Sequence, residues 1–367
     1  MKFSEEFRDR GLVEQICRRI ASRLAVRATI MEVCGTHTMS VARFGLKSLL
    51  PPDVRLVSGP GCPVCVTDQH DIDSFLALGE QPGVILASFG DMLRVPGSST
   101  SLERLRAAGA DVRVVYSPLD AVDVARENPE REIVFFGIGF ETTMPSTALA
   151  IRAAADARVG NFTVYCVHKT MPAALRALLS ADEVRVSGLL LPGHVSTIIG
   201  ADAYTFIAEE LGVPCAVAGF EPVDILLAIE SILDQVRASK PTVGNAYKRA
   251  VPAKANERAR ALIEDVFVPC DARWRGIGVI PDSGIAIADS YGSFDAKRIF
   301  ADALALVKPA PETPCRCGEV LRGVMLPVDC PYFGASCTPT DPIGPCMVSS
   351  EGACAAAYKY GGLDLAE

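Results

Sequence analysis

Short apolar runs alternate with segments of helical periodicity over most of the chain. Residues 84–88, 133–138 and 188–191 are apolar almost throughout, as expected of strands that helices cover on both faces. We expect strands at residues 28–33, 54–58, 83–88, 112–116, 132–137, 162–167, 186–191 and 214–218, and helices at residues 36–48, 69–79, 99–108, 119–127, 142–154, 171–180, 201–211 and 222–237. The alternation predicts an α/β fold of parallel sheets flanked by helices.

The order of these elements repeats once. Strand 83–88 is followed by a Pro-Gly pair, a helix, strand 112–116 and a Pro-Leu-Asp triplet, and the same order recurs from strand 186–191 to Pro222-Val-Asp224. The repeat favours two similar parallel-sheet α/β lobes around a cleft, which is a usual place for a ligand. Chance similarity of two βα units is the alternative that the sequence leaves open.

The two ends of the chain differ from this pattern. Apolar positions at helical spacing over residues 4–25 predict an amphipathic helix that packs on the core. Beyond residue 238 follow an expected helix at 253–266, glycine-rich short strands and a cysteine-rich tail. We therefore divide the chain into an N-terminal helix (1–27), a first α/β lobe (28–128), a second α/β lobe (129–238) and a third region (239–367).

The tail holds the densest group of cysteines. Six of the thirteen cysteines lie beyond residue 314, and four of these have the spacing C-x14-C-x6-C-x16-C: Cys315, Cys330, Cys337 and Cys354. Four thiolates are the ligand set of an iron–sulfur cluster, and a bound cluster would order a segment too rich in proline and glycine to build its own core. Cys317 and Cys346 leave the ligand set open, and a structural zinc site is the alternative.

A second candidate centre is Cys34-Gly-Thr-His37, which ends the first expected strand and opens a helix. Carboxyl ends of parallel strands are the preferred place for active sites, and a helix N-terminus lowers the pKa of a thiol. Cys34 is therefore a candidate nucleophile or metal ligand, with His37 close enough to assist. A buried cysteine followed by a capping threonine explains the same residues without a function.

The next strand ends in Gly59-Pro-Gly-Cys62-Pro-Val-Cys65, again before a helix. A C-x-x-C pair either chelates a metal or forms a disulfide reversibly. Zinc would need a second pair of similar spacing, and none follows nearby. We therefore interpret Cys62 and Cys65 as a reversible dithiol, with a purely structural pair as the alternative.

Two further strand ends carry groups that transfer protons or bind metals. Gly137-Ile-Gly139 precedes Glu141, but Thr142 stands where a dinucleotide-binding loop has its third glycine, which disfavours nicotinamide or flavin binding. Glu141 is a candidate acid or base, or else a helix cap. His194 is a candidate proton carrier or ligand, or else a satisfied loop histidine. Because the carboxyl ends of strands in one parallel sheet share a rim, these groups and the cysteines could converge.

Charge and composition narrow the class of protein. A formal charge of −8 without a long basic run argues against nucleic acid as the main partner. The sequence has no uninterrupted stretch of about 18 apolar residues, so no membrane span is predicted. The charged start of the chain lacks the apolar segment of a signal peptide. We therefore expect a cytoplasmic protein whose cysteines serve as ligands or redox thiols.

Taken together, the motifs resemble those of the HypD family of hydrogenase maturation factors. The resemblance runs from about residue 30 to the C-terminus and rests on the segments CGTHT (34–38), GPGCPVC (59–65), FFGIGFETT (135–143), LPGHVST (191–197), GFEPVD (219–224), CPYFG (330–334), CTP (337–339) and GPCMVSSEGAC (344–354). It implies a scaffold on which the Fe(CN)2CO unit of [NiFe]-hydrogenase is assembled. It also implies two partners, the small chaperone HypC and the protein HypE, which delivers cyanide as a protein thiocyanate.

The resemblance further implies roles for single residues. Cys34 would bind the iron, which carries CN and CO transiently, together with a cysteine of HypC, and His37 would assist. Cys62 and Cys65 would be the redox pair, in an arrangement similar to that of ferredoxin–thioredoxin reductase. Glu141 and His194 would line the central cleft. The ligands of a [4Fe–4S] cluster would be Cys315, Cys330, Cys337 and Cys354. The alternative function is a stand-alone thiol–disulfide oxidoreductase in which the cluster reduces a protein disulfide.

Overall fold

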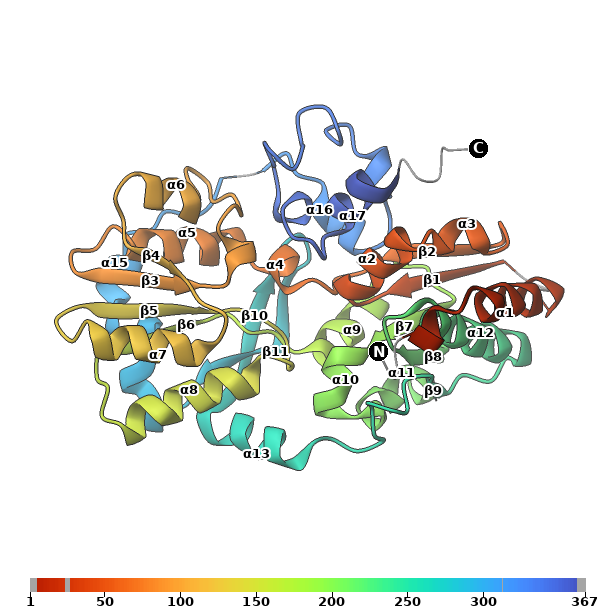
Figure 1. Cartoon of the computed structure of the whole chain (residues 1–367), viewed down its shortest axis with the longest axis horizontal. Coiled ribbons are helices and arrows are strands. Elements are labelled where there is room, and N and C mark those ends of the chain that lie inside the picture. The colour runs from red at the N-terminus through yellow and green to blue at the C-terminus, as the bar shows by residue number, and fades with distance from the viewer. Residues whose placement is uncertain (1–4, 24–26, 312, 362–367) are drawn as a thin grey trace.

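Two parallel sheets stand at opposite ends of the molecule, with an antiparallel hairpin between them (Figure 1). The computed structural model describes residues 5–23, 27–311 and 313–361. One sheet has five strands in the order β2-β1-β7-β8-β9, and the other has four in the order β4-β3-β5-β6. The expected α/β fold with two lobes is confirmed.

All neighbouring strands within each of these two sheets run parallel. The strands of the larger sheet are β1 (Ala28–Glu32), β2 (Val54–Ser58), β7 (Gly188–Pro192), β8 (Cys215–Ala218) and β9 (Val243–Asn245). Those of the smaller sheet are β3 (Val84–Ser88), β4 (Val112–Val114), β5 (Glu132–Gly137) and β6 (Phe162–Cys166). The hairpin is formed by β10 (Phe267–Trp274) and β11 (Gly278–Ile287).

Helices connect the strands and cover the outer faces of both sheets (Figure 1). The α-helices are α1 (Arg10–Arg23), α2 (Gly35–Arg43), α3 (Leu46–Leu49), α4 (Pro63–Val66), α5 (Gln69–Leu78), α6 (Leu102–Ala107), α7 (Pro118–Glu127), α8 (Met144–Asp156), α9 (Met171–Leu179), α10 (Gly193–Ile199), α11 (Thr205–Glu209), α12 (Pro222–Ala238), α13 (Glu257–Val266), α14 (Ala296–Ile299), α15 (Ala301–Ala305), α16 (Cys317–Leu321) and α17 (Ala353–Tyr360). The 3-10 helices are η1 (Glu5–Arg8), η2 (Gly90–Met92), η3 (Ala201–Tyr204), η4 (Asp289–Phe294), η5 (Pro327–Asp329) and η6 (Pro345–Met347). No described helix is long and apolar enough to cross a membrane.

Each expected strand is present, and the differences are local. The expected helix 36–48 is two helices, because Gly45 adopts the left-handed conformation (φ 61°) between them. The short strand β9 and the helix α10 were not expected, since neither is long enough to show a period. At the N-terminus η1 and α1 replace one helix, and residues 4, 24 and 25 of the expected helix lie outside the described residues.

The chain crosses between the sheets twice, which corrects the expected lobe boundaries. Segment 28–128 supplies β1 and β2 to the larger sheet and then β3 and β4 to the smaller one. Segment 129–238 completes the smaller sheet and then returns to the larger one with β7 and β8. A division at residue 128 therefore does not separate the sheets, because β1 pairs with β7 from far along the chain.

The internal repeat corresponds to equivalent units in the two lobes. The connections β3-η2-α6-β4 and β7-α10-η3-α11-β8 both join neighbouring parallel strands, and the helix expected at residues 201–211 is η3 followed by α11. The helices that follow, α7 and α12, both begin with proline and a capping box, formed by Ser117 with Asp120 and by Glu221 with Asp224. Local start signals thus recur at the same place in both lobes.

The apolar core binds the lobes together. One cluster of buried side chains extends from Met31 and Leu189 in the larger sheet to Val134 and Phe136 in the smaller sheet, and includes Trp274 of the hairpin. Two further clusters lie between each sheet and its outer helices. Each sheet is therefore covered on both faces, as the apolar strands predicted.

Replacing Gly61 by alanine should destabilise the fold. The added Cβ would lie 2.2 Å from the amide nitrogen of Cys34, and backbone atoms cannot give way as a flexible side chain can. Overpacking of this kind costs about 1–3 kcal/mol of the free energy of unfolding, which urea denaturation measures. Gly160→Ala is the matched control, because nothing lies within 4 Å of its added Cβ. Equal unfolding free energies for the two variants would contradict this close approach of β1 and β2.

Candidate functional site

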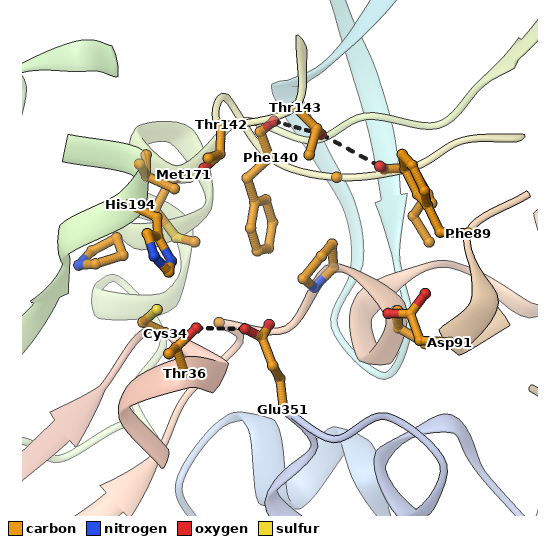
Figure 2. Close-up of a pocket in the computed structure, with 17 residues that line it drawn as sticks. Cys34, Thr36, Phe89, Asp91, Phe140, Thr142, Thr143, Met171, His194 and Glu351 are labelled. Atoms are coloured by element: carbon orange, nitrogen blue, oxygen red, sulfur yellow. Dashed lines mark hydrogen bonds between the residues drawn. The ribbon is translucent and has the colours of Figure 1, made fainter. Parts of the chain in front are cut away.

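A cavity of about 250 Å³ opens where the carboxyl ends of both sheets face each other (Figure 2). The ends of β1, β2 and β7 supply one side, the ends of β3 and β5 the opposite side, and the C-terminal segment contributes Glu351. The lining is mostly apolar, with few polar side chains among its members: Cys34, Thr36, Gly61, Pro63, Val64, Phe89, Asp91, Ile138, Gly139, Phe140, Thr142, Thr143, Met171, Pro192, His194, Val195 and Glu351.

Cys34 is the cysteine that reaches this cavity among the described residues. It is the N-cap residue of α2 and is 6% exposed. Burial raises the pKa of its thiol to about 12, the charge of Glu351 adds to the rise, and the backbone amides of His37 and Thr36 lower it less. The expected effect of the helix N-terminus is therefore present but outweighed by desolvation. A metal ion that binds Cys34 has to displace this proton.

His37 lies behind the cavity wall rather than in its lining. Its Nε2 is 2.9 Å from the carbonyl oxygen of Gly219 and 3.2 Å from that of Ala218, so Nε2 carries the hydrogen and donates it. Nδ1 is buried and has no partner among the described residues. Burial lowers the pKa of His37 to about 4, so the ring is neutral. A role for His37 as a metal ligand stays a prediction.

His194 points into the cavity above Cys34 (Figure 2). Its ring stacks on Phe220, with 4.0 Å between the ring centroids, and loss of surrounding water lowers its pKa. The structure thus brings Cys34 and His194 together from two neighbouring strands of the larger sheet. A neutral imidazole beside the thiol can accept a proton or complete a metal's coordination.

Glu351 is a cavity residue that sequence reasoning missed. Thr36 donates a hydrogen bond to its Oε1 (Figure 2). Burial raises the pKa of Glu351, and the charge of Asp91 raises it further. Its place in the Ser-Ser-Glu-Gly-Ala-Cys segment of the resemblance was a signal, whereas Asp91, which sequence reasoning also missed, had none, since it sits in the short 3-10 helix η2 after β3.

Glu141 is not in the cavity lining but caps a helix behind it. Its Oε1 accepts a hydrogen bond of 2.9 Å from the backbone N–H of Met171, the first residue of α9, and Oε2 is buried without a partner among the described residues. Burial raises the pKa of Glu141 to about 7. The alternative role was a cap for the helix that begins beside Glu141, but the observed contact is with the start of α9 instead. A catalytic role stays a prediction.

Cys62 and Cys65 lie side by side beneath the cavity wall. Their Sγ atoms are 2.6 Å apart, and the N–H of Cys65 donates to Sγ of Cys62 over 3.2 Å. Cys62 also contacts Oγ of Ser349 at 3.3 Å. Both side chains are buried, so the two thiols are positioned to form a disulfide with each other and are shielded from large molecules.

A row of thiols connects this pair to the tail. Burial raises the pKa of Cys65, and hydrogen bonding to Cys346 opposes the rise. Cys346 is in turn close enough to Cys317 to shift its pKa, and Cys317 is close enough to Cys315 to do the same. Sequence reasoning treated Cys317 and Cys346 only as further ligand choices. The structure places them between the Cys62–Cys65 pair and the expected cluster ligands.

The four expected cluster ligands share one neighbourhood. Burial raises the pKa of Cys354, and the nearby sulfurs of Cys315, Cys337, Cys317 and Cys330 add to the rise. The N–H of Ile343 donates to Sγ of Cys337 over 3.4 Å. Among the described residues no three His, Cys, Asp or Glu side chains are placed to share one metal ion.

This neighbourhood suits a cluster better than a single ion. A cubane cluster takes each thiolate on a different iron, so its ligands stand further apart than those of one ion. An added Cβ on Gly344 would lie 2.3 Å from Sγ of Cys315, so a bare backbone leaves space beside that sulfur. Donation of a backbone N–H to a ligand sulfur is also usual around clusters. The residues present therefore fit a [4Fe–4S] cluster.

Comparison with known proteins decides the family. A family model described as "HypD: Hydrogenase formation hypA family" matches residues 10–361. The chain belongs to the HypD family. Hydrogenase maturation factor HypD of Rhodobacter capsulatus is 47% identical and the alignment covers 100% of both chains. The HypD factors of Escherichia coli (strain K12) and Rhizobium leguminosarum bv. viciae are 46% and 45% identical, each over 98% of this chain and over 98% and 96% of their own.

Membership of the HypD family confirms the resemblance found in the sequence and makes the chain a hydrogenase maturation factor. The match includes both lobes and the cysteine-rich tail, since it extends to residue 361. The cavity and the row of thiols are therefore features of a maturation factor, and their roles have to be derived from their chemistry.

Glu141→Gln should remove a pH-dependent loss of stability. Burial raises the pKa of Glu141 from 4.5 to about 7, so the native protein keeps a proton that the unfolded chain releases between these values. Stability therefore falls as the pH rises through this window. The advantage of the variant, whose amide oxygen still accepts from Met171, should grow across the window by about 1–3 kcal/mol and then level off.

Urea denaturation between pH 4 and pH 8 measures this difference. Glu130→Gln, at an exposed position, is the matched control and should show no such trend relative to the unchanged protein. A constant difference between Glu141→Gln and the unchanged protein at all pH values would contradict a carboxyl group that folding keeps protonated.

Proposed function

We propose that the chain assembles the Fe(CN)2CO unit of [NiFe]-hydrogenase in the cavity at Cys34. The iron is the cargo, a HypC-type chaperone shares it, and a HypE-type protein supplies cyanide as a thiocyanate. One observation supports this most: buried thiols follow one another from the tail to Cys62. An added Cβ on Gly35 would lie 3.2 Å from Cβ of Cys62, so the row of thiols ends directly beside the residue that follows Cys34.

The cavity suits a low-spin iron cargo. A soft thiolate holds iron that carries strong-field ligands such as cyanide and CO. Cys34 provides one thiolate, and the mostly apolar lining leaves the remaining coordination positions free for small ligands and for a cysteine of the chaperone. His194, Glu351 and Asp91 are ionisable groups that line the same space and can exchange protons there.

Cyanide release is a two-electron reduction. A protein thiocyanate takes up two electrons and separates into a thiolate and cyanide. Cys62 and Cys65 together supply two electrons when they close to a disulfide and give up two protons. Cys317 and Cys346 form a second adjacent pair, through which the first pair can be reduced again by thiol–disulfide exchange.

The tail would supply electrons to these two pairs of thiols. Cys315, Cys330, Cys337 and Cys354 would hold a [4Fe–4S] cluster, which supplies electrons one at a time. The contact between Cys317 and Cys315 joins the two kinds of centre. Neighbouring pairs of thiols solve the mismatch between one-electron supply and two-electron demand, because a dithiol stores both electrons until they are needed.

Burial disfavours the rival function of a stand-alone thiol–disulfide oxidoreductase. Cys62 is 3% exposed and Cys65 is fully buried, so a disulfide held in the surface of a folded protein does not reach either sulfur, whereas a thiocyanate at the tip of a narrow extension can enter the adjoining cavity. That rival predicts turnover of disulfide substrates without bound iron. A purely structural zinc in the tail predicts a colourless protein, whereas a preparation made without air should be brown.

Cys34→Ala should abolish iron loading while leaving the tail intact. The complex with the chaperone should lose the infrared bands of iron-bound CO and cyanide, because the chain then offers no thiolate in the cavity. The brown colour should remain. Cys17→Ala, on the distant helix α1, is the control and should keep both signals. Persistent infrared bands in Cys34→Ala would rule out this thiolate as the iron ligand.

Cys62→Ala should keep the cluster but stop cyanide release, since one remaining thiol cannot store two electrons. Cys346→Ser should behave differently, because the Cys62–Cys65 pair survives while the path to the tail is broken. We expect at most one cyanide per chain from the pre-reduced Cys346→Ser protein and repeated turnover from the unchanged protein. Full hydrogenase maturation by Cys62→Ala would refute the dithiol role.

A further inference from the structure

Arg275 is a buried guanidinium at the turn of the β10–β11 hairpin. It is 5% exposed. Its Nε donates to the carbonyl oxygen of Thr67 over 2.8 Å, Nη1 donates to Oε1 of Gln69 over 2.7 Å, and its backbone N–H donates to the carbonyl oxygen of Val66 over 2.9 Å. Nη2 is also buried but has no hydrogen-bond partner among the described residues.

No carboxylate of the described chain forms an ion pair with Arg275. Arg249 shows the usual solution, since both of its terminal nitrogens contact the buried carboxylate of Asp224. A guanidinium stays charged in proteins, and a buried charge without a counter-charge carries a penalty of several kcal/mol. A negatively charged group beside Arg275 would offset this penalty, and no carboxylate of the described residues fills that place.

The neighbours of Arg275 are the cysteines of the tail. An added Cβ on Gly276 would lie 2.3 Å from Cα of Gly318, so the backbones that follow Arg275 and Cys317 touch. The guanidinium is close enough for its charge to act on the thiols of both Cys315 and Cys317. Through Val66 and Thr67 the same residue is anchored to the end of α4, the helix that carries Cys65.

We propose that Arg275 is the buried counter-cation of the iron–sulfur cluster and thereby sets how easily the cluster accepts an electron. This rests on the cluster assigned above to the tail cysteines. Four thiolates give a [4Fe–4S] cluster a net negative charge, and reduction adds one more. A fixed positive charge beside the ligand Cys315 stabilises the reduced form more than the oxidised form. Arg275 acts through the field at the cluster, so it is a positioning residue rather than a catalytic one.

A purely structural role for Arg275 makes a different prediction. Its three anchoring hydrogen bonds tie the hairpin to residues 66–69, and their loss would lower the free energy of unfolding without changing the electron affinity of the cluster. The two roles are therefore separated by measuring a reduction potential beside the stability.

The test is a redox titration of the full chain, purified without air, followed by the visible absorbance or electron spin resonance of the cluster. Arg275→Gln should shift the midpoint to more negative potential by about 59 mV, which is a tenfold loss in the one-electron equilibrium constant. Arg275→Lys keeps the charge and should stay within about threefold of the unchanged protein. Arg322→Gln is the control, because Arg322 directly follows the neighbouring helix α16 but pairs with Glu183, and it should leave the midpoint in place.

Gln69→Glu decides the matter if Arg275→Gln does not fold. It keeps the arginine and introduces a carboxylate beside Nη1, so it should shift the midpoint in the same negative direction, whereas Gln69→Ala, which adds no charge, should not. An unchanged midpoint in either charge-altering variant overturns the proposal, even if stability falls. An unchanged protein without any one-electron centre would instead overturn the cluster assignment, so the two failures are distinguishable.

Discussion

The packing of the C-terminal segment against the first turn of α2 is the contact on which the site depends. An added Cβ on Gly35 would lie 2.6 Å from both Cβ and the carbonyl oxygen of Glu351. Ser349 meets Cys62 in the same segment, and Thr36 donates to Glu351. Glycine at position 35 therefore lets Cys34, the Cys62–Cys65 pair and the tail meet at one point, although the tail comes from the opposite end of the chain.

Desolvation is the second constraint, and it governs the charge state of the whole centre. Burial raises the pKa of Cys34 to about 12 and raises those of Cys65 and Glu351 as well. The pKa of Cys346 is also raised, because the effect of its neighbour Cys65 together with burial outweighs the opposing effect of Cys317. Thiols that are neutral when free become anionic only when a metal replaces their protons. Under the proposed function, cargo loading and electron transfer would both be coupled to proton movement in a region with little water, and Glu351 and His194 would be among the groups that accept the protons.

The sequence predicted the secondary-structure elements and the motifs well. It did not predict how deeply a residue is buried or which distant residues it contacts. Apolar runs located every expected strand, and the repeat of proline and aspartate signals marked equivalent helices in both lobes. Sheet membership was not predictable, because β1 pairs with a strand from far along the chain. The predicted shift of the Cys34 thiol pKa was wrong in direction for a related reason. The sequence shows where a helix begins, but it does not show how deeply a thiol is buried.

The site shows the same limits residue by residue. Cys34, Cys62 and His194 were identified from their places after apolar strands, and the tail cysteines from their number and spacing. Cys346 and Arg275 were not assigned roles, because their meaning comes only from neighbours brought by the fold. Glu141 and His37 sit behind the cavity wall rather than in its lining. The spacing of residues along the chain does not show which of these two positions a side chain takes.

The single apolar core that spans both lobes has a mechanical consequence. Side chains of both sheets, among them Met31 and Phe136, pack into one continuous cluster. A hinge-like opening of the cleft would disrupt this packing and expose a large hydrophobic area to water. The shared core therefore holds the two lobes in a fixed relative position. A cavity held in this way keeps its shape before any partner or ligand arrives, with the exposed ring of His194 among its lining residues.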